Sequence, residues 1–131
     1  MEMLCSMNKN FVGNGAMTNK ILLDSVILID HLNGIKDAIN YIAKHYQETA
    51  ITVITRAEVL AELTEKQISE VVKLLNFFSA FDITSDIADN AAELRRVHRW
   101  KLPDAFQAAV AKLHKLKLAT RNTKDFNPKK T

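Results

Sequence analysis

The sequence has few of the features that mark secreted, membrane-spanning or nucleotide-binding proteins. Its 131 residues include one cysteine, Cys5, so no disulfide can form within the chain, and this fits a reducing cytoplasm. No apolar run approaches the roughly 20 residues of a membrane span, and the N-terminus lacks the apolar core of a signal peptide. The chain has neither a P-loop nor a GxGxxG motif. We therefore expect a cytoplasmic protein with no membrane partner.

Two classes of hydrolase lack their required residues here. The four histidines have no HExxH or paired spacing, so a zinc hydrolase is disfavoured; they are His31, His45, His98 and His114. The pattern of the haloacid dehalogenases, which form an aspartyl-phosphate, needs a second Asp two positions after the first. Val26 stands two positions after Asp24 instead.

Charge and composition are those of an ordinary globular protein. Hydrophobic residues make up 47% of the chain, and a chain of this length can bury a sizeable core without disulfides or structural metal. The net charge of +3 is compatible with a polyanionic partner such as RNA, but it is also common in proteins that bind none. Charge alone therefore does not assign a partner.

Short apolar runs alternate with amphipathic segments along the chain. The runs predict strands over residues 21–23, 50–53, 81–83 and 118–120. The amphipathic segments predict helices over residues 25–33, 35–46, 65–78, 85–98 and 104–115, with a further helix opened by a capping box, Thr55 to Glu58. This alternation predicts one α/β domain over residues 19–131, with a parallel sheet of four to five strands covered on both faces. Residues 1–18 show no period and are interpreted as a disordered extension.

Acidic residues follow the predicted strands at separate points of the chain. Asp24 ends the first strand, Glu58 and Asp104 lie in first turns of helices, and Asn122 and Asp125 follow the last strand. Ligands of open parallel sheets bind beyond the carboxyl ends of the strands, so these side chains are expected at one edge. Each acidic residue also has a structural alternative: helix capping for Asp24 and Glu58, capping of a turn for Asp125, and the helix dipole for Asp104.

Converging carboxylates would need a cation. Two of them about 4 Å apart repel by roughly 4 kcal/mol at an effective dielectric of 20. Mg²⁺ or Mn²⁺ would neutralise them through oxygen ligands. A metal site of this kind typically hydrolyses phosphodiesters.

Four stretches in order resemble the PIN domain, specifically the VapC-type toxins of toxin–antitoxin pairs. They are Leu22-Leu23-Asp24-Ser25, Thr55-Arg56-Ala57-Glu58, Leu102-Pro103-Asp104-Ala105 and Thr120-Arg121-Asn122-Thr123-Lys124-Asp125-Phe126. The resemblance implies a three-layer α/β/α fold and a Mg²⁺- or Mn²⁺-dependent endoribonuclease. Asp24, Glu58, Asp104 and Asp125 would be its catalytic and metal-binding residues, supported by Ser25, Thr120 and Asn122. It also implies a homodimer and an antitoxin partner that covers the active site.

Two alternatives to the toxin remain open within the same fold. One is a nuclease of RNA processing or structure-specific cleavage, and the other is a binding module that has lost catalysis. If an antitoxin binds, we expect its helix to lie in an apolar groove on the helices of residues 25–46 and 54–78. The candidate groove residues, which could equally complete the core, are Tyr41, Tyr46, Leu60, Leu63, Leu74 and Phe77.

Overall fold

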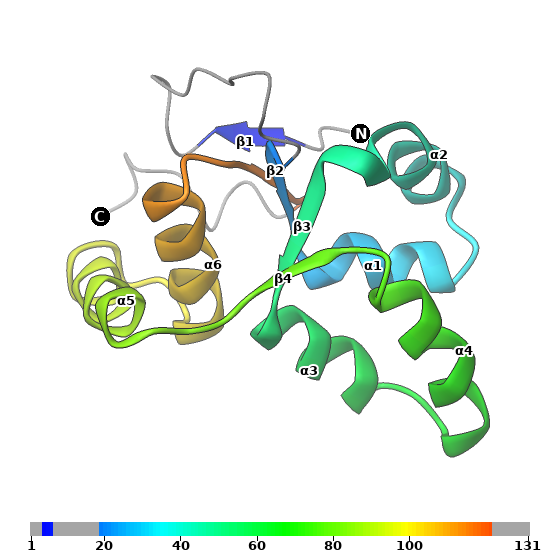
Figure 1. Cartoon of the computed structure of the whole chain (residues 1–131). Coiled ribbons are helices and arrows are strands. Elements are labelled where there is room, and N and C mark those ends of the chain that lie inside the picture. Colours follow the sequence, from blue (N-terminus) through cyan, green and yellow to red (C-terminus); the bar gives the residue numbers. More distant parts are fainter. Residues whose placement is uncertain (1–3, 7–18, 122–131) are drawn as a thin grey trace.

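A five-stranded sheet lies at the centre of the computed structural model, which describes residues 4–6 and 19–121 (Figure 1). The strands, in the order β1-β5-β2-β3-β4 across the sheet, are β1 (Leu4–Ser6), β5 (Lys117–Ala119), β2 (Ile21–Leu23), β3 (Thr49–Thr52) and β4 (Ser79–Phe81). Strands β5, β2, β3 and β4 are parallel neighbours, whereas β1 runs antiparallel to β5. The expected parallel sheet is therefore confirmed for four strands, and the fifth makes the sheet mixed.

Helices cover both faces of this sheet, which confirms the three-layer α/β/α architecture. On one face lie α5 (Ser85–His98) and α6 (Leu102–Leu113), and on the other lie α1 (Ser25–Leu32), α2 (Lys36–His45), α3 (Val53–Ala61) and α4 (Glu65–Leu75). A short 3-10 turn, η1 (Tyr46–Glu48), leads into β3. None of the helices in the described part of the chain is long and apolar enough to cross a membrane.

Strand β2 shows how the sheet divides the core in two. Leu22 packs against the α5 and α6 side, whereas Ile21 and Leu23 pack against the four-helix side, as the alternation of side chains along a strand requires. All three residues are buried, because both faces of the sheet are covered.

The middle of helix α6, a run rich in small apolar residues, is largely buried. Ala105, Ala108, Ala109 and Ala111 have no exposed surface, and α6 packs closely against α5 and the sheet. Trp100, between the two helices, is 4% exposed and is part of the same core. Trp100 is therefore a packing residue of this core.

The N-terminal expectation needs a correction. Leu4–Ser6 form β1, with Cys5 opposite Leu118, so these three residues are not part of a disordered extension. Pairing across the free edge of β5 satisfies backbone groups that would otherwise stay open, and three residues carry no periodicity that could have announced it. The rest of the predicted extension lies outside the described residues.

Candidate active site

Asp24 lies where β2 ends and α1 begins, at the carboxyl edge of the sheet. The parallel register puts Leu23 beside Ala119, so the next residues, Asp24 and Thr120, are neighbours on adjacent strands. The Thr120 hydroxyl donates a hydrogen bond to Asp24 Oδ2 (2.7 Å), and the backbone N–H of Ser25 donates to Oδ1 (2.8 Å). Both carboxylate oxygens are therefore fixed in direction. The structural alternative also holds, because Asp24 is the N-cap residue of α1.

Burial makes the Asp24 charge unfavourable. The side chain is 4% exposed, and desolvation raises the pKa of its carboxyl above 3.8 although hydrogen bonds from Thr120, Ser25 and Gln107 lower it. A buried carboxylate whose hydrogen bonds do not offset its desolvation is one whose charge a cation would stabilise.

Glu58 lies close enough to Asp24 for the two charges to interact. It projects from α3, the helix that follows β3, and is partly buried. Burial raises the pKa of Glu58, hydrogen bonding from Ser25 lowers it, and the negative charge of Asp24 raises it. Ser25 also lowers the pKa of Asp24, so one hydroxyl side chain acts on both carboxylates. The fold thus brings Asp24, Glu58, Ser25 and Thr120 together.

The cap of α3 differs from the predicted one. Thr52, the last residue of β3, caps the helix and accepts a hydrogen bond from the Thr55 N–H (3.1 Å), so Thr55 lies inside the first turn. The prediction that Thr55 and Glu58 form a capping box is wrong, since α3 begins at Val53. Glu58 is therefore free of the structural role that was its main alternative.

A buried polar network joins α3 to α6 beside these carboxylates. The Thr52 hydroxyl donates to Gln107 Oε1 (3.1 Å), and Gln107 Nε2 donates to the Thr55 hydroxyl. Thr52, Thr55 and Gln107 are all at most 1% exposed. Sequence reasoning missed Gln107, although one amide in an otherwise apolar helical stretch is a signal that could have found it.

Asp104 enters this region from α6. It lies in the first turn of the helix, one turn before Gln107, and is partly buried. Helix α6 begins at the edge of the sheet where β2 and β3 end (Figure 1). The network joins Gln107, one turn after Asp104, to Thr55, one turn before Glu58. It therefore brings the part of α6 that holds Asp104 toward the part of α3 that holds Glu58.

Asp30 and Arg121 form a second feature of the edge that the sequence did not reveal. Arg121 Nε donates to Asp30 Oδ2 (2.6 Å) and its Nη2 donates to Oδ1 (3.2 Å), which is bidentate pairing. Asp30 is 8% exposed, so it is a buried residue of α1 and not a solvated one. The hydrogen bond to Asp30 is the main cause that raises the pKa of Arg121, and the charges of Asp30 and Asp24 raise it further.

The described residues hold no complete metal site. Within residues 4–6 and 19–121, no group of three or more His, Cys, Asp or Glu side chains is arranged to hold a metal ion. Asn122 and Asp125 lie outside the described part of the chain. The two carboxylates whose charges interact, Asp24 and Glu58, nevertheless fit a hard divalent cation, because they are oxygen ligands and burial disfavours their charge.

The comparisons with known proteins agree with this geometry. The family model of the PIN domain matches residues 21–128. Ribonuclease VapC10 of Mycobacterium tuberculosis is 33% identical over 113 residues, which cover 81% of this chain and 85% of the relative.

Solved structures are also similar to this chain. A toxin–antitoxin complex from Klebsiella pneumoniae matches with 38% identity and a TM-score of 0.78, covering 82% of this chain and 91% of that one. The fold is also similar to a chain of VapBC2 from Rickettsia felis bound to a promoter DNA fragment, with 20% identity, a TM-score of 0.68 and coverage of 81% and 90%. The chain therefore belongs to the PIN domain family, and within it to the VapC group.

Proposed function

We propose that this protein is an endoribonuclease that hydrolyses RNA phosphodiesters with Mg²⁺ or Mn²⁺, and that it is the toxin of a toxin–antitoxin pair. The observation that carries the nuclease proposal is the pair of Asp24 and Glu58, whose charges are held together at the carboxyl edge of the sheet. Support also comes from the ribonuclease name of the relative that is 33% identical.

Asp24, Glu58 and Asp104 would hold the metal, with Asp125 completing the set and Asn122 supporting it. When bound, the metal would activate a water molecule and stabilise the charge that develops on the phosphate. Mg²⁺ binds through few carboxylates and keeps several waters, which suits a site open to solvent at a sheet edge.

The chain's own residues position these carboxylates. Thr120 and the Ser25 N–H each donate to one oxygen of Asp24, which fixes the orientation of the carboxylate. The Gln107 network ties the start of α3 to α6. This pre-organisation would hold Glu58 and Asp104 in place for a cation.

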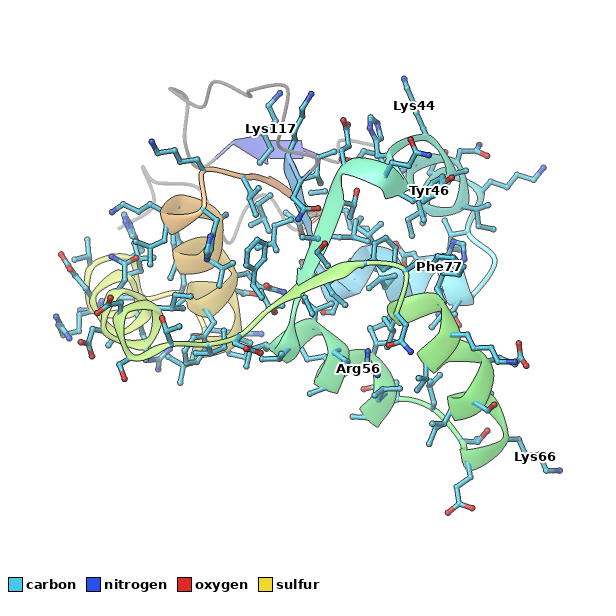
Figure 2. The ribbon with its side chains drawn as sticks, in the orientation of Figure 1. Lys44, Tyr46, Arg56, Lys66, Phe77 and Lys117 are labelled. Carbon is cyan, nitrogen blue, oxygen red and sulfur yellow. The ribbon has the colours of Figure 1, made fainter. Side chains whose placement is uncertain are left out.

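An apolar groove supports the antitoxin part of the proposal. A cavity of about 360 Å³ between α2 and α4 is lined by His31, Ile39, Ile42, Ala43, Tyr46, Leu74, Phe77 and Phe78. Phe77 is 73% exposed and Tyr46 46%, and the two lie on the same side of the molecule (Figure 2). Exposed aromatic side chains around a concave apolar surface suit an amphipathic helix. The solved relative at 38% identity is itself part of a toxin–antitoxin complex.

The predicted groove residues divide into two groups. Tyr46, Leu74 and Phe77 line the groove, whereas Tyr41, Leu60 and Leu63 pack against the core. We propose that an antitoxin helix occupies the groove and that a basic side chain beyond it pairs with the acidic edge and displaces the metal. The homodimer and the cytoplasmic location belong to the same proposal.

The proposed activity is tested with purified chain and a 5′-labelled RNA. Cleavage should require Mg²⁺ or Mn²⁺, stop in excess EDTA, return when the metal is restored, and leave a 5′-phosphate and a 3′-hydroxyl. Undiminished cleavage in EDTA would contradict the metal-dependent mechanism. If the chain cleaves RNA but is harmless when overexpressed and binds no product of a neighbouring gene, the nuclease stands and the toxin proposal fails.

A further inference from the structure

A basic cavity lies outside the site described above, between α5 and α6. Residues 95–101 contain Arg95, Arg96, Arg99 and Lys101 and no acidic residue. The three arginines, with Ala92 and Leu102, line a cavity of about 570 Å³. A concave surface lined mainly by guanidinium groups has the chemistry of a site for phosphate groups.

The backbone that carries these arginines is fixed by local structure. Arg95 Nη1 donates to the backbone oxygen of Trp100 (2.7 Å), and Trp100 is buried and stacks on His98 with ring centroids 4.4 Å apart. Arg99 ends α5 in the left-handed conformation, with φ of 61°. A guanidinium has five N–H donors, so Arg95 keeps others for a ligand.

The arginines of this cavity form no close ion pair within the part of the chain that the structure describes. The ion pairs there join His45 to Glu48, Lys73 to Glu70 and Arg121 to Asp30, and none includes Arg95, Arg96 or Arg99. Cations in the last turn of α5 do stabilise the helix dipole, but that effect needs no cavity and does not extend to Arg99 beyond the helix. Three like charges around one hollow favour an anionic ligand.

The position of the cavity relates it to the acidic edge. Leu102, which lines it, and Asp104 belong to the first turn of α6. We infer that Arg95, Arg96 and Arg99 bind backbone phosphates of the RNA strand that flank the one being cleaved. This inference rests on the proposed ribonuclease activity. Trp100 is buried and cannot stack on a base, so the contact is to the backbone and independent of sequence.

The test measures RNA affinity in the full chain carrying Asp24→Asn, which prevents cleavage during the measurement. Fluorescence anisotropy with a labelled single-stranded RNA compares Arg96→Ala/Arg99→Ala with Lys44→Ala/Lys66→Ala. The control removes the same charge from exposed lysines of α2 and α4, on the other side of the sheet (Figure 2). We expect the arginine pair to weaken binding by about 10-fold and to reduce the slope of log K against log salt by about 1.4, or about 0.7 for each lost phosphate contact. The control should change affinity by less than about twofold.

Two further arms separate this inference from the proposed function. In the active protein, Arg96→Ala/Arg99→Ala should raise KM and retain kcat, and Arg96→Lys/Arg99→Lys should restore most of the affinity, since lysine also pairs with phosphate. Equal weakening of RNA binding in Arg96→Ala/Arg99→Ala and in the control Lys44→Ala/Lys66→Ala, or no weakening in either, would overturn the inference. The proposed nuclease would still stand if the wild type cleaves RNA.

The remaining outcomes are also decisive. A wild-type chain that neither binds nor cleaves RNA overturns both the inference and the proposed function. If the arginine pair weakens antitoxin binding and leaves RNA affinity unchanged, the cavity binds an acidic protein segment, and its assignment to RNA is wrong.

Discussion

On one face of the sheet, α5 and α6 pack through small side chains, whereas on the other face four helices pack through large aliphatic ones. On the α5 and α6 face, a basic cavity lies where α5 ends and α6 begins. The four-helix face leaves a groove lined almost wholly by apolar side chains. Arginines suit a polyanion and exposed aromatics suit an amphipathic helix, so the two faces offer surfaces for partners of opposite chemistry. The carboxylates lie at the carboxyl edge of the sheet, between the two helical layers.

The largest expected effect tests whether the edge between the two faces is where cleavage occurs. Asp24→Asn and Glu58→Gln keep the shape of each side chain but remove its charge, and each should lower kcat/KM by more than about 100-fold, because metal-assisted catalysis supplies several kcal/mol. Asp37→Asn, an exposed carboxylate on α2, is the matched control and should change little. Equal activity of all three variants would place the chemistry elsewhere.

The next largest effect is expected on antitoxin binding, and it shows whether the groove binds the antitoxin or whether any exposed apolar side chain does so. Phe77→Ala should weaken binding of the adjoining small gene product by about 30-fold, since a buried aromatic anchor contributes about 2 kcal/mol or more at an interface. Leu113→Ala removes an exposed apolar side chain from α6 on the opposite face, where Leu113 is 47% exposed.

Binding is measured by calorimetry with both purified proteins. Losses of the same size in Phe77→Ala and Leu113→Ala would remove the distinction between the faces.

A smaller effect is expected from loss of a threonine hydroxyl, and it should depend on which end of the parallel strands carries the threonine. Thr120→Val removes the hydroxyl that donates to Asp24 Oδ2, which should lower activity by about 10-fold, as for other partners that orient metal ligands. Without this hydrogen bond the pKa of Asp24 rises further, so the acid limb of the pH–rate profile should move to higher pH.

Thr49→Val is the control at the opposite end of the sheet. Thr49 is buried and donates to the backbone oxygen of His45 (2.6 Å), so this variant should lower stability and keep the pH profile. A shift of the acid limb in both variants would argue against a specific role for Thr120.

The smallest effect concerns stability without metal. Burial raises the pKa of Asp24 above 3.8, so its protonated form stabilises the fold below that pH, and this contribution is lost as pH rises through the folded pKa. In EDTA, wild-type Tm should therefore fall more than that of Asp24→Asn as pH rises from about 4 to 7, with each unit of pKa shift worth about 1.4 kcal/mol.

Added Mg²⁺ should raise the Tm of the wild type at pH 7 and leave that of the variant nearly unchanged. A wild-type Tm that rises with pH in EDTA, relative to the variant, would contradict the sign of the pKa shift.

The sequence was sufficient for features that depend on neighbouring residues. Apolar runs located β2 and β5, and Asp24 fell at a strand end as expected. The placement of acidic residues after strands indicated the edge, because parallel strands all present their carboxyl ends there.

Contacts between residues far apart in the sequence could not be predicted from the sequence. Asp30 and Arg121 are 91 residues apart, and Thr52 and Gln107 are 55 apart, so no local pattern pairs them. The cap of α3 shows a different limit, since Thr52 and Thr55 are both good cap residues. The residue at which β3 ends determines which threonine caps α3, and the end of β3 depends on pairing with β2 and β4.

The proposed mechanism requires that Asp24, Glu58 and Asp104 form one metal site. Calorimetric titration of Mn²⁺ into the full chain measures this site, with Asp24→Asn, Glu58→Gln and Asp104→Asn compared with Asp37→Asn. We predict a saturable site in the wild type and in Asp37→Asn, weakened by about 10-fold or more in each of the other three. Undiminished Mn²⁺ affinity in any of those three variants would contradict the shared site, and a wild type that binds no Mn²⁺ would contradict the metal-dependent nuclease.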